Sequence, residues 1–539
     1  MQDKEQSDRP RAVRHAEKRR TSTCAFADRI AQLSVDHYHK VVPESFRNEQ
    51  KQTCVATIVA HHCLTKELRV IAMGVGTKFL SNSLLAEETA SPSQYGDRVR
   101  DCHAEVLARR ALRRYLSIQI LNDIKSKKPD TQRDPFRMIL ENSQSTGDAD
   151  NDTTKRPLYK LNPQITLHSY SSSAPCGNAV LKRFVTCRKE VYRDDLGPDE
   201  WPTPYHEDIP GHALSQGEFS LLLKEDKGHR ITTEEKISLQ KRKMTLLSPK
   251  QQSWPSNCQT NWCPAGTTTV FSGKGSLHTC SDKMLRWNIL GWQGSLLSSF
   301  LEESIVPETL TVGRKLSAIT CRRALCCRAV GSNVLKRSKC NRAKQTRKDN
   351  LFESSDSSFC VQVGTIIEDI LPKHPVIMGT SVHLDEEGVV ETDPDNPGQD
   401  VRFHSSLSFA WWLGTDESSP TIITIDNGSL ECIDGATGWA LDPSIVDNGQ
   451  QGNRNCCQKG RNTFVSSVST TALMNFFLSI HQNTTPSKED DDLERTLGKL
   501  REMKLRYGGV YERRKAAYFA EHEVLRTWNR RHILQNSLY

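Results

Sequence analysis

The sequence predicts an α/β protein, because strand-like and helix-like patterns alternate along it. Residues 53–60, 68–73 and 163–170 are rich in β-branched residues or alternate in polarity, which is typical of strands. Residues 26–33 and 104–115 repeat apolar side chains at helical spacing. Strand patterns at 409–412 and 430–433 and an apolar helix at 472–480 extend the alternation into the second half of the chain.

Composition limits the kind of protein this can be. The 539 residues suffice for a large core, but only 36% are hydrophobic and the mean hydropathy is −0.59, so much of the chain should be surface loop. A net charge of +8 favours an anionic partner such as RNA. No leader or membrane-spanning run is visible, so the 17 cysteines indicate an intracellular protein with reduced thiols, some available to bind metal.

The first 80 residues should form a basic tail, a helix and a hairpin. Residues 1–22 are charged, and we expect a disordered tail that could touch RNA. A helix should follow from Phe26, and residues 53–60 and 68–73 should pair as a β-hairpin. Residues 74–78 then form a glycine-containing turn. It could approach a phosphate or a ribose, although an ordinary turn after a strand fits it at least as well.

The next stretch, residues 101–110, contains a His-x-Glu motif formed by His103 and Glu105. The imidazole could bind zinc, and the carboxylate could move protons for a zinc-activated water. The helix that follows has one apolar face, and four arginines occupy the other: Arg109, Arg110, Arg113 and Arg114. The motif alone is common, and a capping histidine with a solvated basic helix face is the simpler interpretation.

A second motif, Pro175-Cys176, follows the strand at 163–170. In zinc deaminases of nucleobases, His-x-Glu is followed by Pro-Cys-x-x-Cys, whose two thiolates complete the zinc site. Here Ala179 occupies the position of the second cysteine. Either the site is broken and Cys176 is an ordinary buried thiol, or the third ligand comes from a distant segment.

A third motif, Cys280-Ser281-Asp282-Lys283, lies beyond a charged segment and is followed by Trp287-Asn288 and by Gln-Gly-Ser-Leu-Leu-Ser at 293–298. With the two earlier motifs it resembles the catalytic domain of the RNA adenosine deaminases, over roughly residues 22–530. That family includes the editors of double-stranded RNA and a tRNA-specific member. The resemblance implies a cytidine-deaminase-like mixed sheet with helices on both faces, enlarged by a C-terminal region.

The resemblance also implies roles for individual residues. The zinc ligands would be His103, Cys176 and Cys280, so that Cys280 replaces the missing local cysteine. Glu105 would transfer protons during attack of water on C6 of adenine. Thr77 and Lys78 match a Gly-Thr-Lys turn that contacts the ribose and phosphate of the target nucleoside.

A buried inositol hexakisphosphate is the second cofactor that the resemblance implies. The residues expected to contact it have basic, aromatic or hydroxyl side chains: Arg109, Arg110, Lys283, Arg286, Trp287, Ser295, Lys504, Tyr511, Lys515 and Trp528. A further lysine of the family's pocket is replaced near Thr470. Arg113 and Arg114 are expected to stay on the solvated face, and a simpler alternative has Lys504 and Lys515 facing water on an exposed helix.

The expected domain plan is a tail at 1–22, a deaminase domain at 23–530 and a short tail at 531–539. Insertions are expected near 142–156, 188–265, 334–358 and 384–402. The last of these should be an acidic loop, and residues 322–348 form a basic segment that could grip RNA or be solvated. The C-terminal region should be a helical tail at 497–528.

The substrate implied is tRNA, because too few residues precede the deaminase domain for a double-stranded-RNA-binding domain. The reaction would be zinc-dependent hydrolysis of adenosine to inosine, 3′-adjacent to the anticodon of alanine tRNA. Two alternatives are deamination of another structured RNA and an inactive deaminase-like RNA-binding protein. A cytidine deaminase fits less well because of Ala179. No obligatory protein partner is evident, and the expected location is the cytoplasm, the nucleus or both.

Overall fold

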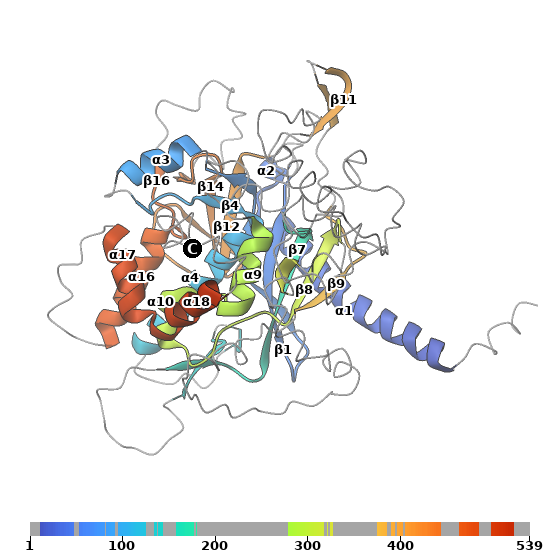
Figure 1. Ribbon diagram of the computed structural model, residues 1–539. Coiled ribbons are helices and arrows are strands. Elements are labelled where there is room, and N and C mark those ends of the chain that lie inside the picture. Colours follow the sequence, from blue (N-terminus) through green and yellow to red (C-terminus); the bar gives the residue numbers. More distant parts are fainter. Residues whose placement is uncertain are drawn as a thin grey trace, which may run out of the picture.

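A computed structural model describes residues 11–47, 53–80, 82–91, 95–125, 134–143 except 137, 158–176, 179, 279–316, 321, 324–326, 375–384, 390–443 except 394–395 and 403–404, 463–484 and 497–521. Figure 1 shows a central twisted sheet with helices packed around it. Within these ranges, no helix is both long and apolar enough to cross a membrane. The insertion expected at 188–265 lies outside the described residues, as do most of the insertion at 142–156 and all of that at 334–358.

The sheet has ten strands in the order β16-β15-β14-β12-β2-β1-β7-β8-β9, with β13 pairing with β14. Its strands are β1 (Val55–His62), β2 (Leu68–Val75), β7 (Ile165–Ser173), β8 (Thr309–Arg314), β9 (Val376–Gly379), β12 (Leu407–Leu413), β13 (Ile422–Ile425), β14 (Gly428–Asp434), β15 (Ala440–Leu441) and β16 (Thr463–Phe464). β7, β8 and β9 run parallel, whereas β1, β2, β12 and β14 pair antiparallel. The expectation of a mixed sheet is therefore confirmed.

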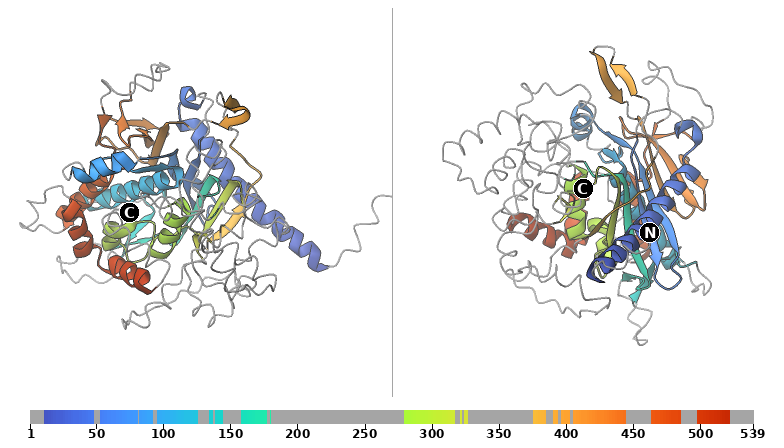
Figure 2. Two further views of the ribbon diagram at one scale, coloured as in Figure 1. Left: turned by 45° about the horizontal axis from the view of Figure 1, so that its top comes forward. Right: turned by 90° about the vertical axis from the view of Figure 1, so that its right-hand side faces the viewer.

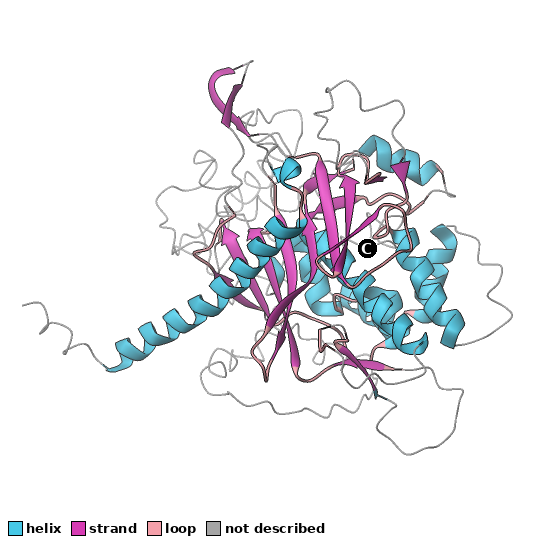
Figure 3. Ribbon diagram, turned by 180° about the vertical axis from the view of Figure 1, so that it is seen from behind, coloured by secondary structure: helices cyan, strands magenta, loops and turns pink. Residues whose placement is uncertain are grey.

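Helices α1 (Arg11–Val41) and α4 (Ala104–Lys125) lie on opposite faces of the sheet. Neighbouring residues of a strand point to opposite faces. In β1, Ala56 packs against Ala104 and Ala108 of α4, while the hydroxyl of Thr57 lies 2.7 Å from that of Ser34 in α1. Figures 2 and 3 show α1 crossing the sheet on the side away from α4 and α9.

Close packing of α4 on the sheet depends on small residues. A Cβ atom on Gly74 of β2 would come within 2.2 Å of the carbonyl oxygen of Ala104 and 2.3 Å of the amide nitrogen of Ala108. Ala56 lies directly opposite Gly74 in the β1–β2 register. The first two turns of α4, which carry the His-x-Glu glutamate, are thus seated on the centre of the sheet.

Helices from the second half of the chain gather beside α4. They are α9 (Cys280–Leu290), α10 (Gly294–Leu297), α16 (Thr470–Thr484), α17 (Leu497–Tyr507) and α18 (Gly509–Glu521), with a short 3₁₀ turn at Ser298–Phe300. α16 packs on α4, α10 contacts α4, α16, α17 and α18, and α18 contacts α9 (Figure 1). Phe477 of α16 joins this group to the core through ring contacts with Phe300 and Tyr507.

Smaller elements complete the fold. α2 (Glu44–Arg47) and α3 (Asn82–Ala90) are short helices, and three two-stranded ribbons are present. The ribbons are β3 (Thr77–Phe79) with β4 (Asp101–His103), β5 (Leu140–Asn142) with β6 (Tyr159–Leu161), and β10 (Val390–Asp393) with β11 (Asn396–Arg402).

Several boundaries differ from those expected. α1 begins at Arg11, inside the segment expected to be a disordered tail. Its first turns are rich in Ala, Arg, Glu and Lys, which favour helix over strand or turn. The loop expected at 384–402 contains the β10–β11 hairpin, which projects from the body in Figure 1. Of the helical tail expected at 497–528, residues 497–521 are described, and they form two helices on either side of Gly508.

Candidate functional site

Three side chains from distant parts of the sequence meet above the carboxyl end of β7. His103 ends β4, Cys176 follows β7, and Cys280 begins α9. One nitrogen of His103 and the two sulfur atoms all lie within 4.8 Å of one another. One imidazole and two thiolates form the donor set of a zinc site that keeps its fourth position open. The residues thus fit a zinc ion.

Local structure explains how Cys280 reaches Cys176. Thr279 caps α9, and Asp282 completes a capping box, so the helix begins at Cys280. The free amides at this helix start then bind the Cys176 segment. The Cys280 amide donates to Sγ of Cys176 at 3.3 Å, and the Ser281 amide donates to its carbonyl at 3.1 Å.

Asp101 positions the ring of His103 through a hydrogen bond, and Asp101 is not part of the sequence motifs. Nδ1 of His103 lies 2.6 Å from Oδ1 of Asp101, which leaves Nε2 for a metal. The other carboxylate oxygen of Asp101 accepts from Nζ of Lys283. Burial alone would raise the pKa of Asp101, but the charges of Lys283 and His103 outweigh it and hold that pKa well below its usual range.

The two candidate ligand thiols, Cys176 and Cys280, influence each other's pKa. A hydrogen bond from Cys280 lowers the pKa of Cys176, more than burial raises it. Burial lowers the pKa of His103, whereas Asp101 and Cys176 raise it to a net value of about 9. The pocket therefore favours a thiolate at Cys176, whereas the hydrogen bond to Cys176 and burial raise the pKa of Cys280 well above its usual range. A bound cation would be needed to favour the thiolate form of both residues.

Glu105 lies in the first turn of α4, buried beside the three candidate ligands. Its exposed fraction is 7%, and the hydroxyl of Ser171 in β7 donates to Oε1 at 3.2 Å. A carboxylate anchored through one oxygen keeps the other for a proton-transfer partner. The arrangement is able to move protons next to a metal-activated water.

Thr77 and Lys78 lie in β3, which corrects the expectation of a simple turn. Thr77 is directly opposite His103 in the β3–β4 ribbon, and Lys78 is opposite Cys102. The buried Oγ1 of Thr77 has no hydrogen-bond partner among the described residues. Buried hydroxyls are normally paired, so this atom is suited to a substrate group.

A second polar cluster lies between α4, α9, α10, α17 and α18. The guanidinium of Arg109 stacks 4.6 Å above the ring of Trp287. Arg113 of α4, Arg286 of α9, and Lys504 and Lys515 of the C-terminal helices are close enough to influence one another's pKa. We call these six residues the basic cluster. Lys515 also bonds Glu512 at 3.0 Å, so one carboxylate borders the basic cluster.

The basic cluster is only partly compensated: Lys515 is paired with Glu512, whereas several other buried atoms have no hydrogen bond among the described residues. Burial and the charges of Arg113 and Arg286 hold the pKa of Arg109 well below its usual range. Burial and the neighbouring Lys515 do the same to Lys504. Buried atoms here that lack hydrogen-bond partners among the described residues include three donors (Nε of Arg109, Nε of Arg113 and Nε1 of Trp287), the hydroxyl of Ser295, and one acceptor, Oε1 of Glu512. Converging buried donors and like charges fit a polyanion.

The four arginines of α4 divide differently from the expectation. Arg113 belongs to the basic cluster. Arg114, expected to face solvent, is buried, and its Nε donates to Asp416 at 2.8 Å. The expectation was wrong because α16 and the segment around Asp416 cover this side of α4, which helical spacing alone does not reveal.

The other expected contacts of the inositol phosphate divide: Lys283 bonds Asp101 behind the candidate metal ligand, whereas Arg110 and Tyr511 lie beside the basic cluster. Arg110 donates to the carbonyl of Val468 at 2.7 Å and lies near Thr470, where the family's lysine is replaced. Tyr511 is buried, and its pKa is raised by burial and lowered by Arg109 and Arg286. Lys504 and Lys515 are partly buried rather than on an open helix face. Trp528 lies outside the described residues.

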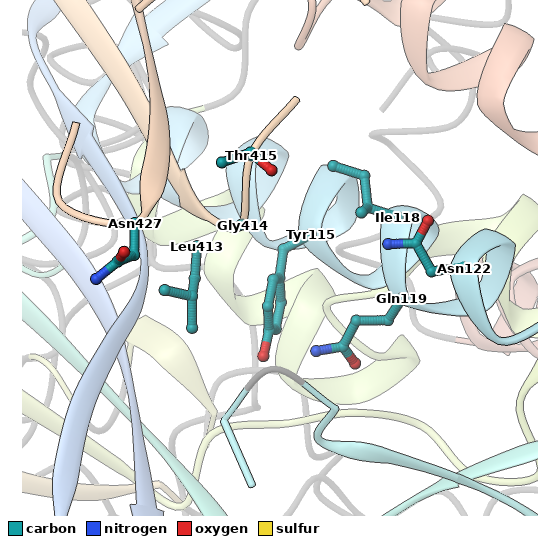
Figure 4. Close-up of a pocket in the computed structure, with 8 residues that line it drawn as sticks. All are labelled: Tyr115, Ile118, Gln119, Asn122, Leu413, Gly414, Thr415 and Asn427. Atoms are coloured by element: carbon teal, nitrogen blue, oxygen red, sulfur yellow. The ribbon is translucent and has the colours of Figure 1, made fainter. Parts of the chain in front are cut away.

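A cavity of about 180 Å³ lies elsewhere, between the second half of α4 and the loop after β12 (Figure 4). It is lined by Tyr115, Ile118, Gln119, Asn122, Leu413, Gly414, Thr415 and Asn427. None of these residues belongs to the metal site or the basic cluster, so this cavity is separate from the chemistry described above.

Comparison with known proteins identifies the family. Residues 72–362 match the adenosine-deaminase (editase) domain, which is more than half of the chain. The chain therefore belongs to that family of adenosine deaminases acting on RNA, which are zinc-dependent in general. All three candidate ligands fall inside the matched region.

Two kinds of relative are similar to this chain. The tRNA-specific adenosine deaminase 1 of Mus musculus is 27% identical over 376 residues, covering 58% of this chain and 70% of the relative. Its Homo sapiens counterpart is 25% identical over 403 residues, covering 62% and 75%. The double-stranded RNA-specific editase B2 of Rattus norvegicus is 25% identical over 280 residues, covering 51% of this chain and only 29% of its own length.

Two candidate functional residues, Asp101 and Arg113, were not predicted from the sequence. Asp101 stands two residues before His103, and a second carboxylate beside a ligand histidine is a signal that could have identified it. Arg113 is four residues from Arg109 and so shares its helix face, which helical spacing could have shown.

Proposed function

We propose that this chain is a zinc-dependent deaminase that converts adenosine to inosine in tRNA, and that residues 23–530 form its deaminase domain. The convergence of His103, Cys176 and Cys280 beside Glu105 is the observation that supports this most strongly. Preference for tRNA is supported by the relatives, because those named tRNA-specific match over 70–75% of their length. The double-stranded RNA editases match over 29% and 35% of their length.

The proposed reaction is hydrolysis at C6 of adenine, in which water replaces the amino group and ammonia leaves. Zinc, when bound by His103, Cys176 and Cys280, supplies the Lewis acidity that makes water a nucleophile near neutral pH. Glu105 takes a proton from the attacking water and delivers protons to the ring nitrogen and the leaving amine. Ser171 fixes the carboxylate, and Asp101 fixes the tautomer of His103.

Binding of the target nucleoside would use the β3–β4 ribbon. Thr77 lies opposite His103 and has a buried hydroxyl that is free to bond a ribose oxygen. Lys78 is one residue further from the metal site, where a phosphate of the same nucleotide would follow. A base in an RNA loop is already unpaired, so moving it into the pocket costs less than removing one from a duplex.

We further propose that the basic cluster holds an inositol hexakisphosphate. The support is the set of buried donors without partners and the mutual lowering of pKa values among its arginines and lysines. A polyphosphate would bond those donors and neutralise the charges. The same anion would join α4 and α9 to the C-terminal helices.

Incubation of purified protein with alanine tRNA and a panel of other tRNAs, read by inosine-dependent sequencing, tests the reaction. We expect inosine 3′-adjacent to the anticodon of alanine tRNA. A perfect RNA duplex in the same assay separates the two kinds of relative. Inosine in the duplex alone would contradict the tRNA assignment, and inosine in no RNA, from a protein that contains zinc, would contradict the proposed activity.

A further inference from the structure

The carboxyl end of β8 lies beside the candidate metal centre and carries two consecutive basic residues, Arg314 and Lys315. β8 runs parallel to β7, so both strands end at the same edge of the sheet. Arg314 is opposite Ser173, and the amide of Ala174 donates to the carbonyl of Arg314 at 2.9 Å. Cys176 is only two residues further along, so the ligand loop rests directly on this strand end.

The side chain of Arg314 belongs to the active-site face of the sheet. Ser171, which bonds Glu105, lies opposite Val312 in the β7–β8 register. Side chains alternate along a strand, so Arg314, two residues after Val312, is on the same face as Ser171. The exposed Lys315 continues from it at the rim.

The backbone brings the end of β8 close to the end of β7 and directs Lys315 toward solvent. A Cβ atom on Gly313 would come within 2.7 Å of the carbonyl oxygen of Ser172, so glycine lets β8 approach the end of β7. Lys315 has a φ of +60°, in the left-handed region that non-glycine residues rarely adopt. The turn places Leu316 against Gly379 of β9 and leaves Lys315 facing outward.

The charges that influence Cys54 also indicate that Arg314 and Lys315 lie near the candidate metal centre. Cys54 of the segment before β1 lies close enough to Glu105, Cys176, Arg314 and Lys315 for all four to influence its pKa. The pair therefore flanks the site from the β8 side, while Lys78 flanks it from the β3 side. A nucleotide seated over Glu105 would have basic groups on two sides.

We propose that Arg314 and Lys315 bind a backbone phosphate of the RNA strand next to the target adenosine. This inference rests on the proposed action on RNA. A polynucleotide that presents one base to the site must carry the phosphates on both sides of that base past its rim. Guanidinium and ammonium groups are the usual partners of such phosphates, and they position the strand without reading its sequence.

The experiment measures binding of fluorescently labelled alanine tRNA to the full-length protein across a range of salt concentrations. Each lost phosphate contact with a single strand should lower the slope of log affinity against log salt by about 0.7. We expect that decrease for Lys315→Gln, and about twice as much for the double variant with Arg314→Gln. Thermal unfolding of each variant is recorded in parallel, and the exposed Lys315→Gln change serves alone if the double variant is unstable.

Lys66 offers a matched control. It is exposed, has the same φ of +60°, and lies in the turn between β1 and β2 at the opposite edge of the sheet. Lys66→Gln should leave the slope at the wild-type value. Equal slopes for Lys66→Gln and Lys315→Gln would overturn the inference.

A parallel assay for inosine separates this inference from the proposed function. Wild-type protein that binds tRNA with a slope sensitive to Lys315, but forms no inosine, would refute the activity and support the contact. Inosine formation with a slope that does not change in either rim variant would support the activity and refute the contact. Absence of tRNA binding by the wild type would refute both.

Discussion

Oδ1 of Asp101 lies 2.6 Å from Nδ1 of His103, and the second oxygen of the same carboxylate bonds Lys283. One buried carboxylate thus links the candidate metal ligand to α9, the helix that also carries Arg286 and Trp287. One hydrogen-bond network thus joins His103, Asp101 and Lys283, and it ends on the helix that carries two residues of the basic cluster. A change at Asp101 is therefore expected to disturb α9 as well as His103.

Asp101→Asn tests that network. The change leaves the buried Lys283 without its anionic partner, and breaking a buried pair in this way typically costs about 3–5 kcal/mol. We expect the free energy of unfolding, measured with denaturant, to fall by an amount of that order. The exposed Glu302→Gln change is the control and should have no effect. A variant as stable as the wild type would show that the pair contributes little.

Glu105→Gln should remove proton transfer while leaving the metal in place. We expect inosine formation to fall by about a hundredfold or more, the usual size of a general acid–base contribution. Zinc content, measured by elemental analysis, should stay at the wild-type level because Glu105 is not a ligand. Near-normal turnover in this variant would refute the assigned role.

Cys280→Ser should lower zinc binding. The wild-type protein is expected to carry about one zinc ion per chain, and the variant to lose most of it together with activity and thermal stability. Cys63→Ser is a matched control, since Cys63 is a partly exposed thiol in the β1–β2 turn. A folded wild-type protein without zinc would instead favour an inactive RNA-binding module.

Lys515→Gln tests the basic cluster. If a polyphosphate stabilises the C-terminal helices, the variant should retain less phosphorus through purification and unfold at a lower temperature. Arg513→Gln, on the exposed face of the same helix, should change neither quantity. Wild-type protein that contains no phosphorus after dialysis would contradict the proposed cofactor.

His168 should make stability depend on pH. Burial, with a smaller effect of His61, lowers the pKa of His168 from about 6.5 to about 4, while its ring bonds Thr309 and Thr166. The unfolded chain therefore takes up a proton first as the pH falls, and the folded state loses stability between pH 6.5 and pH 4. The loss approaches 1.4 kcal/mol per pH unit at most.

The matching measurement compares denaturant unfolding of wild type and His168→Gln between pH 7 and pH 4. The variant should show a shallower decline, and the exposed His39→Gln should follow the wild type. Parallel curves for wild type and His168→Gln would show that this histidine does not sense the change.

The amino-acid sequence alone predicted many of the strands and most of the candidate site. Alternating patterns located β1, β2, β7, β12 and β14, because burial of one or both strand faces imposes them on the sequence. The identities of His103 and Cys176 indicated two candidate zinc ligands, because few side chains bind zinc, and the resemblance to a known family supplied Cys280 as the third and Glu105 as the proton carrier. Strand patterns and ligand identities depend on local residue types, so they can be read from the sequence without the three-dimensional structure.

Only the tertiary structure decided how these parts face one another. Cys280 is 104 residues from Cys176 along the chain, and the β7 end and the α9 start bring them together. Helical spacing places Arg113 and Arg114 next to Arg109 and Arg110, but it does not say what covers them. α16 and the segment around Asp416 bury Arg114, and the C-terminal helices enclose Arg113. Contacts between distant segments assign a partner to each charge, and no local pattern encodes those contacts.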